Sequence, residues 1–428
     1  MPRVTVLEYA RLTTDRVPPS LHLATITQSA FDWLCRESGR LCASGAALVQ
    51  VGDRRWLRLD NYVGVVETPC GTQLEILPKH VDGEDQIASA RRLLRKMLSR
   101  CLDLPVREAE PSDIQAFDAP LNEWVIRRFL DGLERLVKRG VRFDYHRVGE
   151  EQRFLRGRLD LARQLRQSPV RRHVFQIEHD VYDADRAENR LLCSALDRVC
   201  RMTRDARNWR LSHELATYLA PVPRSTNYSV DFRAWRSDRH VAHYRGMRPW
   251  CSLILNEQTP LSIVGQWNGV SLLFPMEKVF ERYVGACLRR DLATGVSVTA
   301  PAANKYLCTH LGQPWFQLKP DFLLKQDPNR WVLDTKWKRL DAAQSDGGGK
   351  YGISQADFYQ LFAYGKHYLD GRGDLFLIYP MTADFREPLP EFRFDANLRL
   401  WVIPFDLERG ALVGSTGTSL PLRTLLAA

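Results

Sequence analysis

Residues 319–336 read KPDFLLKQDPNRWVLDTK, and this stretch decides the fold of the C-terminal part of the chain. Two apolar runs flank the tetrapeptide 327–330, in which proline fixes one backbone dihedral while Asp and Asn tolerate turn geometry. The runs therefore predict two neighbouring antiparallel strands. Folding this hairpin brings Asp321 near Asp334. Lys336 leaves the same face of the strand as Asp334, because side chains two residues apart on a strand share a face.

Two carboxylates and an ammonium group that converge on one point predict a metal site. Burying like charges together is costly unless a cation neutralises them. Mg²⁺ held by Asp321 and Asp334 would keep water ligands and a substrate phosphate oxygen, and Mn²⁺ is expected to substitute. Such an ion polarises a phosphate and lowers the pKa of a bound water, while Lys336 can position or deprotonate that water or stabilise the developing charge. The alternative is a surface hairpin whose aspartates only cap turns.

The sequence around this hairpin alternates between helical and extended patterns. Helices are expected at 274–292 and 353–369. Strands are expected at 296–298, 315–325, 331–337, 375–379 and 400–403. This order predicts an α/β domain with a central mixed sheet over residues 263–428.

The rest of the chain divides into a β-rich part and a helical part. Within residues 1–82, extended runs are expected at 4–9, 47–51, 56–59, 63–66 and 73–76, with one helix at 21–36. Within residues 83–262, helices are expected at 85–102, 121–139, 186–202 and 211–219, with an extended stretch at 142–161. The sequence therefore predicts a multidomain α/β protein: a β-rich N-terminal module, a mainly helical middle region and a C-terminal α/β domain.

The charge balance allows a polyanionic partner. The 428 residues include 61 basic and 51 acidic ones, so the formal net charge is +10. Basic residues gather in two clusters: Arg91, Arg92, Arg95, Lys96 and Arg100 in the first, and Arg163, Arg166, Arg171 and Arg172 in the second. This excess fits DNA, although each cluster taken singly also fits a solvated helix face.

Cysteine usage and the N-terminal sequence favour the cytoplasm. The chain has nine cysteines, an odd and scattered set without a C-x-x-C pair, which indicates reduced and mostly buried thiols. The start of the chain lacks the apolar core of a signal peptide, and no stretch approaches a membrane-spanning length. We therefore expect a cytoplasmic protein without a membrane partner.

The pattern Pro-Asp, hairpin, Asp-x-Lys resembles the PD-(D/E)XK nuclease superfamily. Residues 280–284, FERYV, look like part of the leading helix of that superfamily, whose acidic residue completes the site. Gln360 and Tyr364 look like the Q-x-x-x-Y element of its RecB-like branch, and they lie one helical turn apart. The alternative for these two is an ordinary helix with polar edge residues.

This resemblance implies roles for seven residues. It implies metal contact for Glu281, Asp321 and Asp334, and it makes Lys336 the catalytic lysine. Gln360, Tyr364 and Lys338 are expected to support the site or to contact DNA. Glu277, one turn before Glu281, is the alternative acidic residue, although the Phe-Glu pair at 280–281 fits better.

Nearly the whole chain is similar to the McrC family, the nuclease subunits of McrBC modification-dependent restriction systems. The matching segments are 63–68 (VGVVET), 76–79 (ILPK), 154–160 (FLRGRLD), 189–192 (NRLL) and 280–284 (FERYV), followed by the nuclease motif. Each middle segment is a weak signal, and their order along the chain carries the resemblance.

The family resemblance implies partners and a division of labour. The implied partners are an McrB-like AAA+ GTPase ring and double-stranded DNA with methylated cytosine, and the N-terminal region would stimulate the GTPase. A polar group from the loop at Lys79 and His80, or from residues 60–62, could reach the partner's phosphates. The chain itself lacks a G-x-x-x-x-G-K-[ST] motif, and residues 347–351 (GGGKY) are the nearest approach. We therefore expect no nucleotide hydrolysis by this chain alone.

Two other functions remain open from the sequence. The first is a free-standing RecB-like DNA-processing nuclease; the four-cysteine iron–sulfur pattern of some such enzymes is absent, because Cys251, Cys287 and Cys308 are too dispersed. The second is a non-catalytic adaptor with a nuclease fold, which the intact Asp321, Asp334 and Lys336 disfavour. Dependence on GTP and a partner separates the first from the restriction subunit, and metal-dependent cleavage excludes the second.

Overall fold

The computed structural model forms two compact units. Unit 1 comprises Met1–Leu121 and Pro260–Ala428, and unit 2 comprises Asn122–Thr259. The residues that the structure describes are 3–41, 48–53, 55–80, 86–102, 120–171, 173–235, 242–255, 271–292, 295–299, 305–345 and 348–414. The predicted boundaries after 82 and after 262 lie outside these residues, so the three-part division stays a prediction.

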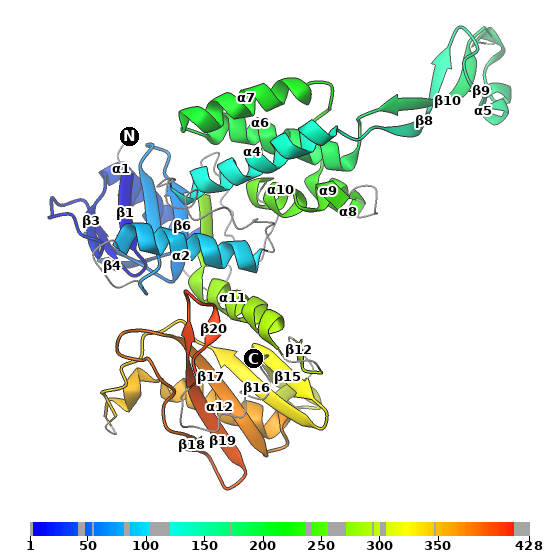
Figure 1. The fold of residues 1–428 in the computed structure, drawn as a ribbon. Helices are drawn as coiled ribbons and strands as arrows, with labels where there is room; N and C mark the ends of the chain where they lie inside the picture. The colour runs from blue at the N-terminus through cyan, green and yellow to red at the C-terminus, as the bar shows by residue number, and fades with distance from the viewer. Residues whose placement is uncertain are drawn as a thin grey trace. The chain divides into compact units, whose positions relative to one another are not determined.

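The N-terminal part of unit 1 consists of two four-stranded sheets (Figure 1). Its strands are β1 (Arg3–Leu7), β2 (Arg11–Thr13), β3 (Leu23–Thr25), β4 (Val49–Asp53), β5 (Trp56–Leu59), β6 (Tyr62–Glu67), β7 (Gln73–Leu77) and β11 (Ser271–Pro275). One sheet has the order β1-β7-β6-β11 and the other β3-β2-β5-β4. Four of the predicted extended runs form two antiparallel hairpins, since β4 pairs with β5 and β6 with β7.

The predicted helix at 21–36 is wrong in its first turns. Residues Leu23–Thr25 form β3, which pairs in parallel with β2. The helix α1 (Gln28–Leu41) begins after Thr27, whose hydroxyl accepts a hydrogen bond from the Ala30 backbone N at 3.3 Å. The side-chain oxygen of Thr27 therefore marks the start of the helix.

A close backbone approach explains the glycine of the VGVVET segment. Gly64 in β6 has φ of +129° and faces Leu273 of the antiparallel strand β11. A Cβ at Gly64 would lie 1.8 Å from the Leu272 carbonyl oxygen, so no other residue fits. This contact connects the N-terminal sheet to the strand that leads into the C-terminal part of unit 1.

The C-terminal part of unit 1 is built on a mixed sheet, as predicted, and this sheet has seven strands. Its strands are β12 (Ser297–Thr299), β15 (Phe322–Gln326), β16 (Asn329–Thr335), β17 (Gly373–Pro380), β18 (Phe392–Arg393), β19 (Leu398–Asp406) and β20 (Ala411–Leu412). The order is β12-β15-β16-β17-β19-β18, with β20 also pairing with β19. Strands β16, β17 and β19 are mutually parallel, and the other pairings are antiparallel.

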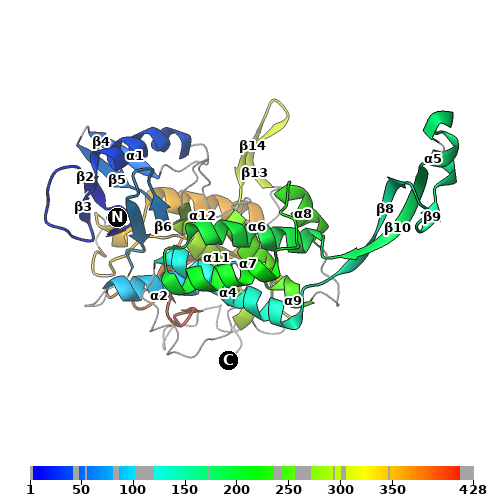
Figure 2. The same cartoon turned by 90° about the horizontal axis from the view of Figure 1, so that it is seen from above.

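The predicted hairpin at 319–336 is confirmed, but the single strand predicted at 315–325 is wrong. Strands β15 and β16 pair antiparallel from Phe322↔Leu333 to Gln326↔Asn329. The segment before β15 is a separate strand, β14 (Gln313–Leu318), which pairs with the unpredicted β13 (Lys305–His310) in a hairpin of its own, visible in Figure 2. The proline at 320 supplies no N–H to a sheet, which fits the break between β14 and β15.

Two helices cover the two faces of this sheet. Helix α12 (Gln355–Tyr368) packs through Leu361 and Tyr364 on one face, where Val332 and Leu375 lie. Helix α11 (Met276–Asp291) packs on the other face. There the Phe280 and Phe405 rings lie 6.0 Å apart, and the backbone of Gly285 approaches the Phe322 ring. Helix α2 (Gln86–Cys101) lies against α11, with a Cys101–Val279 hydrogen bond of 3.1 Å.

Unit 2 combines a helical group with an extended β arm (Figures 1 and 2). Its helices are α4 (Leu121–Arg139), α6 (Ala187–Met202), α7 (Ala206–Tyr218), α8 (Tyr228–Ala234), α9 (Ala242–Arg245) and α10 (Arg248–Leu255). The arm consists of β8 (Asp144–Gln152), β9 (Arg158–Leu159), the short helix α5 (Leu161–Leu165) and β10 (Phe175–Asp183). The predicted helix 121–139 is confirmed; the one predicted at 211–219 begins five residues earlier, because Asp205 caps α7 by accepting from the Arg207 and Asn208 backbone N–H groups.

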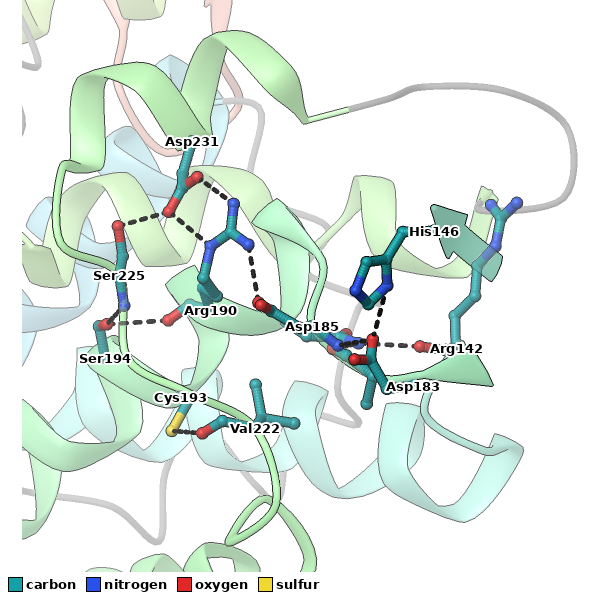
Figure 3. Close-up of polar contacts among 12 residues, drawn as sticks. Arg142, His146, Asp183, Asp185, Arg190, Cys193, Ser194, Val222, Ser225 and Asp231 are labelled. Carbon is teal, nitrogen blue, oxygen red and sulfur yellow. Dashed lines mark hydrogen bonds and ion pairs between the residues drawn. The ribbon is translucent and has the colours of Figure 1, made fainter. Parts of the chain in front are cut away.

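The NRLL segment ties the arm to the helices of unit 2 (Figure 3). Asn189 in α6 is fully buried and donates from Nδ2 to the carbonyl oxygens of Arg142 and Ala184, both at 2.9 Å. Arg190 forms ion pairs of 2.7 Å with both Asp231 and Asp185. These contacts give the segment a structural role at the base of the arm.

The cysteines form no disulfide among the eight that the structure describes, and Cys42 lies outside these residues. Cys251 and Cys287 are buried, whereas Cys70 and Cys308 are exposed, so the expectation of mostly buried thiols is wrong. In the described parts of the chain, no helix combines the length and the apolar character needed to cross a membrane.

Candidate active site

The structure brings Asp321 and Asp334 together at the end of the β15–β16 hairpin. Asp334 is the penultimate residue of β16, and only 2% of it is exposed. Asp321 lies directly before β15 and is half-buried; it stands one position beyond the Phe322↔Leu333 pair, opposite Asp334. The backbone N–H and the hydroxyl of Thr335 donate to Oδ2 of Asp321 at 2.7 and 2.6 Å. These bonds fix one carboxylate beside the other.

Burial and neighbouring negative charges raise the pKa of both carboxyl groups. Burial, together with the negative charges of Asp334 and Glu281, raises the pKa of Asp321 to about 7. Burial also raises the pKa of Asp334; the charge of Lys336 opposes this, and the charges of Asp357 and Glu281 add to it. A site that penalises negative charge in this way attracts a cation.

Lys336 supplies one positive charge to this site. Its ammonium group pairs with Asp334 and donates to Oε1 of Gln360 at 3.1 Å. Burial lowers the pKa of Lys336, but the hydrogen bond and negative charge of Asp334 outweigh it, so the net pKa is raised. Lys336 is therefore held in its charged form when no metal is present.

Gln360 and Tyr364 form the next links of the network. Gln360 donates from Nε2 to the Tyr364 hydroxyl at 2.7 Å. That hydroxyl donates to the carbonyl oxygen of Lys319 at 3.0 Å, and Tyr364 is 2% exposed. The network thus runs from Lys336 through helix α12 to the segment that carries Asp321. Gln360 and Tyr364 thus connect helix α12 to the carboxylate–lysine cluster, and their role in supporting the site stays a prediction.

Lys338 forms an ion pair with Asp357, a residue that the sequence analysis did not single out. Its ammonium group pairs with Oδ2 of Asp357 at 3.0 Å, and the Tyr379 hydroxyl donates to the same oxygen at 3.3 Å. Asp357 is 7% exposed in the first turn of α12, and its charge acts on Asp334. The available signal was spacing, because Asp357 precedes Gln360 by three residues and shares its helix face.

Glu281 lies on the site side of α11, whereas Glu277 faces elsewhere. The negative charge of Glu281 acts on both Asp321 and Asp334, and Glu281 accepts from Lys278 at 2.6 Å. Glu277 is exposed, and its charge acts on Glu8 and Lys79 in the N-terminal part of unit 1. The arrangement therefore favours Glu281 as the acidic residue of the site.

The donor chemistry of the site fits a hard divalent cation. Carboxylate oxygens from Asp321, Asp334 and Glu281 are the ligands that Mg²⁺ and Mn²⁺ prefer. Among the described residues, no three His, Cys, Asp or Glu side chains already stand in a ready-made metal geometry. In the structure the ammonium group of Lys336 neutralises Asp334 instead. A bound cation would relieve the repulsion that raises the pKa of Asp321.

The N-terminal loops proposed to reach a partner are largely buried. His80 is 8% exposed, and its ring lies 3.9 Å from that of Trp337. Asn61 and Tyr62 are 9% and 1% exposed. These three side chains serve internal packing, whereas Asp60 and Lys79 in the same loops are half-buried. That one of these loops reaches a partner nucleotide stays a prediction.

The fold and the site define a multidomain α/β protein with a carboxylate–lysine cluster at one edge of a mixed sheet. The chain belongs to the family described as McrBC 5-methylcytosine restriction system component, whose profile matches residues 57–380. This match covers more than half of the chain, from β5 to the end of β17.

Two solved structures have a similar fold. One is a chain of the refined half-complex from the tetradecameric assembly of Thermococcus gammatolerans McrB AAA+ hexamers with bound McrC: the TM-score is 0.68 and the identity 19%, covering 94% of each chain. The other belongs to the cryo-EM structure of the T. gammatolerans McrBC complex: the TM-score is 0.51 and the identity 20%, covering 68% of this chain and 88% of that one. A search of curated proteins gives no match.

Proposed function

We propose that this chain is the metal-dependent DNA endonuclease subunit of an McrBC-type restriction complex, with a PD-(D/E)XK-type nuclease domain. The observation that carries the proposal is the cluster around Asp334, a buried carboxylate that pairs with Lys336. The charge of Glu281 raises the pKa of both Asp334 and Asp321, and the charge of Asp334 also raises the pKa of Asp321. A buried cluster of perturbed carboxylates with a lysine is expensive for folding and typical of a catalytic site.

The site residues have distinct tasks in phosphodiester hydrolysis. Asp321, Asp334 and Glu281 would hold Mg²⁺, which when bound polarises the scissile phosphate and lowers the pKa of a water. Lys336, in its charged form, orients the attacking water and stabilises negative charge on the phosphate oxygens. Gln360 keeps the Lys336 ammonium group in reach of the site through their 3.1 Å hydrogen bond.

The partner and substrate follow from the family. The McrBC family description names 5-methylcytosine restriction, and the similar solved chains come from assemblies of McrB AAA+ hexamers with McrC. We infer that this chain also joins an AAA+ GTPase ring and stimulates its GTP hydrolysis. DNA with methylated cytosine is the inferred substrate, and the formal net charge of +10 favours association with a polyanion.

A cleavage assay on cytosine-methylated and unmethylated plasmid tests the proposal. The purified chain is incubated with Mg²⁺, with and without an McrB-like partner and GTP. We expect only the methylated plasmid to be cleaved, and only when both the partner and GTP are present. Cleavage by the chain alone, indifferent to GTP, would instead identify a free-standing DNA-processing nuclease. No metal-dependent cleavage under any of these conditions would exclude a nuclease.

A further inference from the structure

A buried glutamate of the N-terminal β structure lies against the residue that follows Lys336. Glu8 stands in the turn between β1 and β2 and is 2% exposed. Its Oε1 accepts a hydrogen bond from the indole Nε1 of Trp337 at 2.7 Å and another from the Lys79 backbone N at 3.0 Å. Glu8 and Trp337 are 329 residues apart in sequence, so one side chain joins the N-terminal part of unit 1 to the lysine-bearing segment.

Trp337 is the neighbour of one site residue, Lys336, and its ring contacts the neighbour of another, Glu281. It is 2% exposed and directly follows Lys336, whose backbone N–H donates to the Ile378 carbonyl oxygen at 2.9 Å. Successive side chains of an extended segment point in opposite directions, so Lys336 faces the carboxylates while Trp337 faces away from them. On that side the Trp337 ring lies 5.3 Å from the ring of Phe280, the residue before Glu281. A shift of Trp337 therefore moves both Lys336 and the helix turn of Glu281.

The Glu8 turn is costly for stability, which favours a functional reason for it. The second carboxylate oxygen of Glu8, Oε2, is buried and has no hydrogen-bond partner among the described residues. A buried polar atom without a partner costs about 1–3 kcal/mol. Tyr9, the next residue, has φ of 65°, in a region that bulky side chains rarely adopt. Costs of this kind collect where a fixed local geometry matters more than stability.

We propose that Glu8 is a positioning residue of the nuclease: through Trp337 it fixes the backbone of Lys336 and, through the ring of Phe280, the helix turn that carries Glu281. The inference rests on the proposed function, because it assigns a task within the same site. The Glu8 turn then contributes to catalysis, and its displacement changes the rate of cleavage without any contact to DNA.

Three variants of the full chain separate positioning from packing. Glu8→Ala removes the acceptor, Glu8→Gln keeps an amide oxygen that can accept both hydrogen bonds, and Trp337→Phe keeps a ring but removes the donor. Glu75→Ala is the matched control. Glu75 is another fully buried carboxylate of the same β structure, and it pairs with Arg91 and Arg3 at 2.8 Å.

The first readout is the single-turnover rate of cleavage with metal, partner and GTP. We expect Glu8→Ala and Trp337→Phe to slow the rate about tenfold, equal to about 1.4 kcal/mol in the barrier, with DNA affinity within about twofold of the wild type. Glu8→Gln should restore the rate to within about threefold. Glu75→Ala should lower the melting temperature but leave the rate unchanged. The double variant Glu8→Ala/Trp337→Phe should be no slower than the slower single variant, because both substitutions remove the same Glu8–Trp337 hydrogen bond.

The second readout, amide hydrogen exchange, does not depend on activity. Glu8→Ala should speed exchange at residues 335–339 and 278–282, and Glu75→Ala should not. If the wild type cleaves no DNA, the proposed function fails, and the exchange comparison still decides whether Glu8 positions these segments. Wild-type rate and exchange in a folded Glu8→Ala protein would overturn the proposal, as would equal rate losses in Glu8→Ala and Glu75→Ala. Should Glu8→Ala fail to fold, unchanged rate and exchange in Trp337→Phe would overturn it.

Discussion

Asp334 is surrounded by charges of both signs, and its role can be separated from its contribution to packing. It is 2% exposed, pairs with Lys336, and lies within electrostatic reach of Asp357 and Glu281. Removing its carboxylate takes away a proposed metal ligand and also relieves charge repulsion. Activity should therefore respond to this change much more strongly than folding.

We predict that Asp334→Ala lowers the cleavage rate on the order of 100-fold or more, the magnitude typical for loss of a charge-stabilising group in an active site. The metal-free variant should keep its fold and its binding to the partner, because the repulsion it removes offsets the lost ion pair. Lys336→Ala should lose activity similarly. Asp395→Ala is the control, since Asp395 is exposed and forms an ion pair with Lys366 far from this cluster in the sequence. Preserved cleavage in either site variant would contradict the assignment.

The raised pKa of Asp321 predicts a pH dependence of stability in the absence of metal. Its pKa rises from an ordinary 3.8 to about 7 in the folded protein. Between these two values the folded state holds a proton that the unfolded chain has released, so stability falls as pH rises. The contribution is complete below pH about 4 and is lost as pH rises through about 7.

Thermal melting in a metal chelator between pH about 5 and about 7.5 checks this sign. The melting temperature of the wild type should fall more steeply with pH than that of Asp321→Asn, which cannot ionise. Added Mg²⁺ should flatten the wild-type slope, because a cation compensates the ionised carboxylates. Parallel slopes for the two proteins would show that Asp321 titrates normally.

At the scale of residues, the sequence predicted those members of the site that lie close together along the chain. Asp321, Asp334 and Lys336 lie within sixteen residues joined by one turn, so turn chemistry and strand alternation were enough to bring them together. Their catalytic role stays a prediction. Asp357 was missed because its signal, a three-residue spacing from Gln360 on one helix face, is too common to single out one aspartate. Glu8 was missed because its partner Trp337 is 329 residues away.

Helix α11 illustrates, at the scale of elements, how closely the site is packed. A Cβ at Gly285 would lie 2.6 and 2.9 Å from two ring carbons of Phe322, the residue after Asp321. The ring belongs to the sheet core and is 4% exposed. The helix therefore approaches β15 through a glycine, and the distance between Glu281 and the aspartates depends on it.

We predict that Gly285→Ala destabilises the protein by about 1–3 kcal/mol, as overpacking of a well-filled core does. Gly132→Ala in α4 is a matched control, because its Cβ would meet only the flexible end of Met247 at 2.6 Å. There, the gain in helix propensity of about 1 kcal/mol offsets a small adjustment. Chemical denaturation of both variants measures the difference. Equal stability of the two variants would refute the tight contact between α11 and Phe322.

Element prediction succeeded for strongly periodic segments and failed where pairing is non-local. Helix 121–139 was predicted with its observed ends because its apolar spacing is regular. Strand β3 was predicted as helix, since its three residues are extended only through parallel pairing with β2. Strand β13 was missed because its side chains are mostly exposed and show no apolar alternation. Long-range pairing overrides weak local preference in such short strands.

At the scale of the whole molecule, unit 1 is discontinuous in sequence. Residues Met1–Leu121 and Pro260–Ala428 share one compact unit, with unit 2 as an insertion between them. Strand β11 completes the N-terminal sheet beside β6, and Glu8 reaches Trp337. Local composition suggested a separate N-terminal module. The pairing of β6 with β11 could not be foreseen, because a sequence pattern does not show which distant strand completes a sheet.

This organisation predicts that metal stabilises one unit only. Each unit has its own buried core, so calorimetry of the full chain should show two transitions, and Gly285→Ala should lower the one that belongs to unit 1. Mg²⁺ at about 100 times its dissociation constant adds about 2.7 kcal/mol to the state that binds it. The unit 1 transition should therefore move to higher temperature while the unit 2 transition stays in place. Asp334→Ala should abolish the shift, because the proposed ligand set is then incomplete. If the shift persists in this variant, or if both transitions shift equally in the wild type, the metal binds elsewhere.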